Sequence, residues 1–215
     1  MYRRKIYYNN IVKKMRVNTR KYIQQCNIEQ NPLKKSIICK HYLNSVEWSF
    51  IMEKYLKNKF SLINSYTHNS GDGITQNGKN IEIKVSLGDA KGKFNFVNLR
   101  PYHNIDYYLF MCYNLYEKKY GKVYIFICKS SKIYSLLPKY GEYAQGNITT
   151  LGPITKQSII KNKKKYITYV LRPNPNQINT KSKELWDKLI KYSIISDYKI
   201  NKIFGNTKFI HKKIE

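Results

Sequence analysis

A short segment near the middle of the chain, Gly71–Lys84, constrains the fold more than any other feature of the sequence. Asn77-Gly78 is a strong signal for a tight β-hairpin, so the residues before it should fold back antiparallel to those after it. After the turn, Ile81, Ile83 and Val85 alternate with polar residues, which is typical of a strand with one buried face. The segment therefore predicts a hairpin on which a larger sheet can be built.

The hairpin carries three charged residues whose faces depend on its register. Glu82 and Lys84 are two apart on one strand, so their side chains point to the same face. A two-residue loop would place Asp72 on the opposite face. A three-residue loop through Lys79, with Gly78 in the left-handed conformation, would pair Asp72 with Lys84 and bring all three groups together.

Two carboxylates and one ammonium are enough to hold a divalent metal against a phosphodiester. Asp72 and Glu82 would be ligands of Mg²⁺ or Mn²⁺, with the main-chain carbonyl of Ile83 as a third oxygen. Lys84 would orient the attacking water or stabilise the developing negative charge. The ordinary alternative is that Asp72 only forms the turn, and that Glu82 and Lys84 line the solvent face of an antiparallel strand.

The pattern resembles the signature of the PD-(D/E)xK nuclease superfamily, in which an Asp is followed by Glu/Asp-x-Lys on the next strand. Asp72 matches the first acid, Glu82 the second and Lys84 the lysine, while Gly71 stands where the family often has Pro. The resemblance covers roughly residues 42 to 130 and depends on a short motif. It implies a restriction-endonuclease-like α/β fold, with a mixed central β-sheet flanked by helices, and metal-dependent cleavage of DNA.

Many members of this superfamily carry a further Glu on the helix that precedes the Asp strand. Glu47 and Glu53 both lie in the corresponding segment. Glu47 is favoured, because on a helical wheel it falls between Leu43 and Ile51 on an apolar arc. The resemblance thus implies that Glu47 assists the metal.

The apolar periodicity predicts an alternating set of helices and strands. Helices are expected over 42–60, 130–140 and about 180–192, and strands over 81–85, 93–99, 106–113, 122–128 and 165–171. Residues 1–41 form a basic N-terminal arm broken at Pro32, and residues 42–215 form a single nuclease domain with a basic C-terminal extension from about residue 179.

The charge of the chain indicates a polyanionic partner. Forty Lys and Arg against 13 Asp and Glu give a formal charge of +27. An A+T-rich genome explains abundant Lys, Asn, Ile and Tyr, but it does not explain the scarcity of acids. Nucleic acid is the first interpretation and an anionic membrane surface the second, and we expect DNA.

The candidate contacts to DNA follow the strand predicted over 93–99 or belong to the loop that contains Pro173 and Pro175. Arg offers a bidentate fork to phosphate or guanine, whereas Lys offers a point charge. For Arg100 the alternative is a turn in which it pairs with Asp106. The predicted contacts are Arg100, Tyr102, His103, Asn104 and Arg172.

Other sequence features limit the class of protein. No apolar run approaches the ~20 residues of a membrane span, so no membrane insertion is expected. The cysteines form no CxxC pair, and the histidines add no zinc-finger spacing, which favours reduced core cysteines in an intracellular protein: Cys26, Cys39, Cys112 and Cys128. The basic N-terminus lacks the apolar core of a secretory signal, and an organelle presequence is the alternative to a phosphate-binding arm.

The sequence therefore favours a site-specific endonuclease of restriction or homing type. A homodimer is expected if it cuts both strands of a symmetric site. The first alternative is a junction-resolving or repair nuclease, which recognises the shape of DNA. The second is a basic nucleic-acid-binding protein without enzymatic activity.

Overall fold

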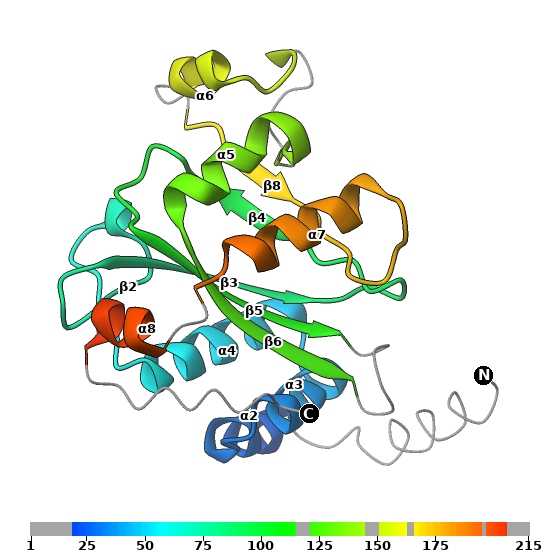
Figure 1. Cartoon of the computed structure of the whole chain (residues 1–215). Helices are drawn as coiled ribbons and strands as arrows, with labels where there is room; N and C mark the ends of the chain where they lie inside the picture. The colour runs from blue at the N-terminus through cyan, green and yellow to red at the C-terminus, as the bar shows by residue number, and fades with distance from the viewer. Residues whose placement is uncertain (1–18, 115–120, 145–150, 163–165, 195–196, 206–215) are drawn as a thin grey trace. The chain divides into compact units, whose positions relative to one another are not determined.

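The computed structural model describes residues 19–114, 121–144, 151–162, 166–194 and 197–205 (Figure 1). The chain divides into two compact units, Met1–Tyr55 and Leu56–Glu215. The division falls within one long helix, α4 (Ser45–Lys59), which is the helix expected over 42–60.

The first unit is helical in its described part. It contains α2 (Thr19–Ile28) and α3 (Pro32–Tyr42), followed by the first turns of α4. Pro32 separates α2 from α3, as expected of a break, and is also the first residue of α3, where a missing N–H costs nothing. Asn31 caps α3, because its side-chain oxygen accepts hydrogen bonds from the backbone N–H groups of Leu33 and Lys34.

The second unit is built on a five-stranded mixed sheet of order β1-β2-β3-β5-β6. β3 and β5 are parallel, and the other neighbours are antiparallel. Helices flank the sheet, so the prediction of an α/β fold with a mixed sheet is confirmed. The strands are β1 (Ile63–Asn64), β2 (Gly73–Ile74), β3 (Asn80–Leu87), β5 (Tyr107–Asn114) and β6 (Lys122–Lys129).

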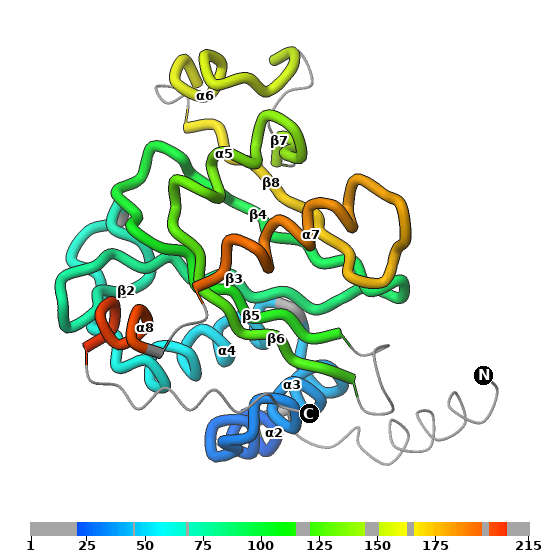
Figure 2. Tube along the Cα trace, viewed as in Figure 1, coloured from blue at the N-terminus to red at the C-terminus, as the bar shows by residue number. Residues whose placement is uncertain are grey.

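A second, three-stranded antiparallel sheet has the order β4-β8-β7. It consists of β4 (Phe96–Leu99), β8 (Tyr169–Leu171) and β7 (Glu142–Tyr143). The strands expected over 93–99 and 165–171 both belong to it, so they do not extend the central sheet. The end of β4 and the start of β8 lie at the same side of this sheet, as the trace in Figure 2 shows.

The main core lies on the face of the central sheet that α5 (Ser130–Tyr140) and α7 (Lys181–Tyr192) cover (Figure 1). Phe110 of β5 is fully buried there, together with Leu137 of α5 and Leu189 of α7. Burying each such side chain contributes about 1.5–3 kcal/mol. On the opposite face, Ile83 and Leu109 are also buried, so both faces of the central strands are covered.

Two short helices complete the second unit: α6 (Lys156–Asn162) and α8 (Asp197–Phe204). The segment of α8 belongs to the expected basic C-terminal extension, in which no helix was expected beyond about residue 192. Instead Ile200, Ile203 and Phe204 are buried, and the Phe204 ring lies 4.8 Å from the Phe60 ring, centroid to centroid. Their spacing of three and four residues places them on one side of a helix. Within the described ranges, no helix combines the length and the apolar character that crossing a bilayer requires.

Candidate active site

The hairpin forms with a three-residue loop, Gln76–Gly78. Thr75 donates its N–H to the Lys79 carbonyl at 2.9 Å, and the Thr75 hydroxyl accepts the N–H of Lys79 at 3.0 Å. Gly78 has a φ of 70°, the left-handed conformation that this loop length was expected to need. Loop length and the role of Gly78 are therefore as predicted.

The register differs from the predicted one by two residues. Gly73 pairs with Ile81, so the direct continuation of the ladder leads Asp72 to Glu82, where Lys84 was expected. The loop begins one residue earlier than expected because the Thr75 side chain closes it. A shift of two residues keeps the same face, so the three charged groups still approach one another.

Asp72 occupies the edge of β3 that β2 leaves unpaired. Its N–H donates to the Ile81 carbonyl at 2.8 Å, and its carboxylate Oδ2 accepts the N–H of Ile83 at 2.7 Å. Alternate residues of a strand present their main-chain groups to the same edge, so the Ile83 carbonyl is directed to this edge as well. Gly71 permits the close approach, because a Cβ there would lie 2.6 Å from the Ile81 oxygen and its φ is 80°.

Glu82 and Lys84 form an ion pair that is mostly withdrawn from solvent. The Lys84 Nζ lies 2.6 Å from the Glu82 Oε1, and the two side chains are 14% and 12% exposed, lysine first. In the β3–β5 ladder Glu82 is the partner of Tyr108 and Lys84 that of Phe110, so both point to the face that α5 and α7 cover. The alternative of a solvent-facing strand is therefore wrong.

Asp72 lies in an environment that disfavours its charge. Burial raises the pKa of Asp72, and the nearby Glu82 carboxylate raises it further. The Ile83 N–H, Lys84 and Lys57 oppose this rise in the pKa without cancelling it. An acid that is held in an unfavourable environment beside a second acid is a typical setting for a bound divalent cation.

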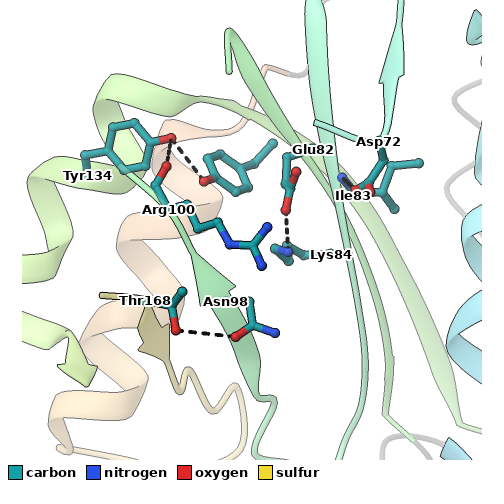
Figure 3. Close-up of polar contacts among 9 residues, drawn as sticks. Asp72, Glu82, Ile83, Lys84, Asn98, Arg100, Tyr134 and Thr168 are labelled. Atoms are coloured by element: carbon teal, nitrogen blue, oxygen red, sulfur yellow. Dashed lines mark hydrogen bonds and ion pairs between the residues drawn. The ribbon is translucent and has the colours of Figure 1, made fainter. Parts of the chain in front are cut away.

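Arg100, the residue after β4, completes the polar group. Figure 3 shows its guanidinium directed toward the Glu82–Lys84 pair, with Asn98 of the same strand nearby. The backbone here is held from α5, because the Tyr134 hydroxyl donates to the Arg100 carbonyl at 3.3 Å. Asp106 pairs with Lys79 at 4.0 Å, so the alternative in which Arg100 pairs with Asp106 is not observed.

Two tyrosines that sequence reasoning missed border the site. The Tyr108 and Tyr134 hydroxyls are 3.1 Å apart. Burial raises the pKa of both phenols, that of Tyr134 to about 12, and the Glu82 charge adds to the rise. The only sequence signal is indirect, because Tyr108 becomes the neighbour of Glu82 through the parallel pairing of β3 with β5.

The other residues proposed to contact DNA differ in exposure and in their partners. Tyr102 is partly exposed, Asn104 is exposed, and His103 is 9% exposed, with its N–H donated to the Arg100 carbonyl. Arg172 forms an ion pair with Glu142. Arg100, by contrast, points at the charged residues of the hairpin (Figure 3).

Glu47 belongs to the first unit and has a local partner. The Asn44 side chain accepts the N–H groups of Val46 and Glu47, and the Glu47 carboxylate accepts the N–H of Asn44 at 3.2 Å. This reciprocal arrangement is a capping box that begins α4. It accounts for a Glu at this position without a metal.

The donor set suits a hard cation with few protein ligands. Within the described residues, no cluster of three or more His, Cys, Asp and Glu is present. Two carboxylates and one carbonyl nevertheless match the habit of Mg²⁺, which retains several waters and is completed by substrate phosphate. Asp72, Glu82 and the Ile83 carbonyl therefore fit Mg²⁺ or Mn²⁺.

The fold and the site define an α/β protein with a mixed sheet, whose β2–β3 hairpin carries two largely buried acids and a lysine, with an arginine from the end of β4 directed toward them. Comparisons of the chain with protein-family models, with curated proteins and with solved structures found no match.

Proposed function

We propose that this protein is a metal-dependent endonuclease, with a restriction-endonuclease-like core, that hydrolyses phosphodiester bonds of DNA. The observation that carries the proposal is the gathering of Asp72, Glu82 and Lys84 in a largely buried site. The protein has only 13 acidic residues against 40 basic ones, and two of the acids meet here at an energetic cost. A basic protein that only binds DNA gains nothing from this arrangement.

The side chains divide the work of hydrolysis. Asp72, Glu82 and the Ile83 carbonyl would hold Mg²⁺ or Mn²⁺, whose charge polarises the phosphate and makes water more acidic. Lys84, released from Glu82 in part when a cation shares that carboxylate, donates a hydrogen bond to the attacking water or to a phosphate oxygen.

Arg100 acts on the substrate rather than on the acids. Its guanidinium can bind two oxygens of one phosphate and so fix the scissile group beside Lys84. Water adds to phosphorus, one P–O ester bond breaks, and the products are a phosphate monoester and a free hydroxyl. The attacking water releases one proton to the solvent, and the leaving oxygen takes up one proton from the solvent, so the protons balance.

The surroundings of the site support its rigidity. The Tyr108–Tyr134 hydroxyl pair and the Tyr134 bond to the Arg100 carbonyl connect β5, α5 and the end of β4. Side chains that are held in place before the substrate arrives lower the cost of reaching the transition state. A site-specific enzyme of restriction or homing type, dimeric at symmetric sites, is the form of the proposal that the sequence favours.

The test is cleavage of plasmid, linear duplex and branched DNA in Mg²⁺ and in EDTA. Wild-type protein should cut in Mg²⁺, and EDTA or Asp72→Asn should abolish the cut. The matched control is Asp187→Asn, which makes the same chemical change on the exposed side of α7. Cleavage that survives Asp72→Asn, or none by wild type on any substrate, refutes the proposal.

A further inference from the structure

A pair of tyrosines lies beside Arg100, where the second sheet brings two distant segments together. Leu99, the last residue of β4, pairs with Tyr169, the first residue of β8. The turn after β4 contributes Tyr102, and the segment before β8 contributes Tyr166. Their rings are 6.2 Å apart, centroid to centroid, at an interplanar angle of 80°.

Tyr166 is held in a position that the fold alone does not explain. It is 76% exposed, and its φ of 52° lies in the left-handed region. A bulky residue rarely adopts this conformation, which costs on the order of 1–3 kcal/mol. Folding recovers little of that cost, because most of the ring remains in water.

The same edge is shaped by a second residue with positive φ. Asn98 of β4 has a φ of 56°, and its side-chain oxygen accepts the Thr168 hydroxyl at 3.4 Å across the two strands (Figure 3). Asn98 and Arg100 both come from the end of β4, so this end of the sheet carries an amide and a guanidinium close to the turn that contributes Tyr102.

Arg100 lies between the tyrosine pair and the proposed active site and acts on both. Arg100 is directed toward Glu82 and Lys84 (Figure 3). Its charge also acts on Tyr102, where it opposes the rise that burial causes in the pKa of that phenol. One residue therefore connects the hairpin acids with the aromatic pair.

We propose that Tyr102 and Tyr166 form a stacking site for an unpaired base of the DNA whose adjoining phosphate lies on Arg100. Within a continuous duplex both faces of each base are covered by its neighbours, so only an unpaired or extruded base can stack on a side chain. An exposed aromatic next to a guanidinium, on a chain of charge +27, is suited to such a base and its phosphate.

This inference names the substrate class of the proposed nuclease and, for the cleavage step, rests on that proposed function. The substrate is DNA with unpaired nucleotides beside the cut, such as a flap, a bulge or a junction. That choice favours the junction-resolving or repair class over an enzyme that reads only continuous duplex.

The test measures binding in EDTA, so that no cleavage is required. Fluorescence anisotropy compares a duplex with the same duplex carrying a short flap, and 2-aminopurine in the flap reports stacking by quenching. The wild type should prefer the flap and quench the probe. Tyr166→Asn, which removes the ring and suits a positive φ, should weaken flap binding about ten- to a hundredfold and leave duplex binding unchanged.

Two further variants separate stacking from a structural effect. Tyr166→Phe keeps the ring and should retain flap binding. Tyr198→Asn removes a tyrosine on α8 with the same 76% exposure and should change neither affinity. Equal losses in Tyr166→Asn and Tyr198→Asn, or no preference of the wild type for the flap, would overturn the stacking site.

The two proposals fail in distinguishable ways. A protein that binds the flap through Tyr166 but cuts no DNA in Mg²⁺ retains the stacking site and refutes the nuclease. A protein that cuts duplex and flap equally, with no effect of Tyr166→Asn, retains the nuclease and refutes the stacking site.

Discussion

Two ion pairs in the second unit have the same length and different surroundings. The Glu82–Lys84 pair and the Glu184–Lys139 pair both have an N–O separation of 2.6 Å. The first has side chains that are 12–14% exposed, and the second has side chains that are 44–62% exposed. Distance alone therefore does not describe what either pair does.

The difference lies in what each pair costs and in what lies next to it. An exposed pair is screened by water and contributes little. A mostly buried pair must repay the loss of hydration of both charges, which it seldom does by attraction alone. Here a second acid, Asp72, lies next to the buried pair. The pKa of Asp72 is raised by burial and by the Glu82 carboxylate. We infer that this pair is retained for chemistry and the other for the surface of the molecule.

The largest expected effect comes from removing the lysine of the buried pair, Lys84, compared with removing that of the exposed pair, Lys139. Lys84→Met leaves Asp72 and Glu82 buried without their ammonium, so the free energy of unfolding should fall by about 3 kcal/mol. Cleavage should fall at least about a hundredfold, because a group that stabilises developing charge is lost. Lys139→Met is the matched control and should alter neither quantity. Urea unfolding and cleavage rates measure both.

Adding Mg²⁺ tests whether the stability that Lys84→Met loses depends on a metal site. If the acids form a metal site, Mg²⁺ should recover part of the stability that Lys84→Met loses, because a cation again shares the two carboxylates. Lys139→Met should show no larger response to Mg²⁺ than the wild type shows. A Lys84→Met protein whose midpoint of unfolding is the same in Mg²⁺ and in EDTA contradicts the proposed metal site.

Asp72→Asn should separate stability from activity. The amide oxygen can still accept the Ile83 N–H, but the charge that burial and Glu82 disfavour is gone. In EDTA at neutral pH, stability should rise by roughly 1 kcal/mol, or about 2–4 °C in a protein of this size, while cleavage is lost. Asp187→Asn, on the exposed face of α7, should show neither change. Loss of stability in Asp72→Asn would show that the carboxylate supports the fold.

The pH dependence of stability should follow the raised pKa of Asp72. A raised pKa means that the folded state binds the proton more tightly than the unfolded state does, whose value is near 3.8. The contribution of this group is therefore fully present below that value and is lost as the pH rises through the raised pKa. Between the unfolded and the folded pKa of Asp72, Mg²⁺ should also bind more tightly as the pH rises, by up to about tenfold per pH unit, because the metal and the proton compete for the carboxylate. Calorimetric titration should find this slope in wild type and not in Asp72→Asn.

The sequence predicted the hairpin well because the information is local. Asn77-Gly78 sets the turn and Gly78 the left-handed position, but the start of the loop depends on the Thr75 side chain, which composition does not reveal. Asp72 and Glu82 were found from their spacing. The tyrosine at position 108 was not, because its place beside Glu82 needs the β3–β5 pairing across 26 residues.

Other differences arise from weak or misleading local signals. The buried residues of α8 recur at helical spacing, but the lysines between them led to the prediction of a basic extension without a helix. Glu47 was singled out by its place on an apolar arc, and Asn44 three residues earlier signals the capping box in which the structure places it. For α8, a pattern that was present was given too little weight.

The smallest expected effect comes from the acid of the exposed pair. The neighbouring Lys139 ammonium lowers the pKa of Glu184, but the carboxylate is exposed to solvent. Glu184→Gln should therefore leave the midpoint of unfolding and the cleavage rate unchanged within error, whereas Glu82→Gln makes the same substitution beside Asp72 and should abolish cleavage. Thermal unfolding and cleavage assays at low and high salt check both variants. If Glu184→Gln were as damaging as Glu82→Gln, burial would not distinguish the two pairs, and a catalytic role of the hairpin acids would be contradicted.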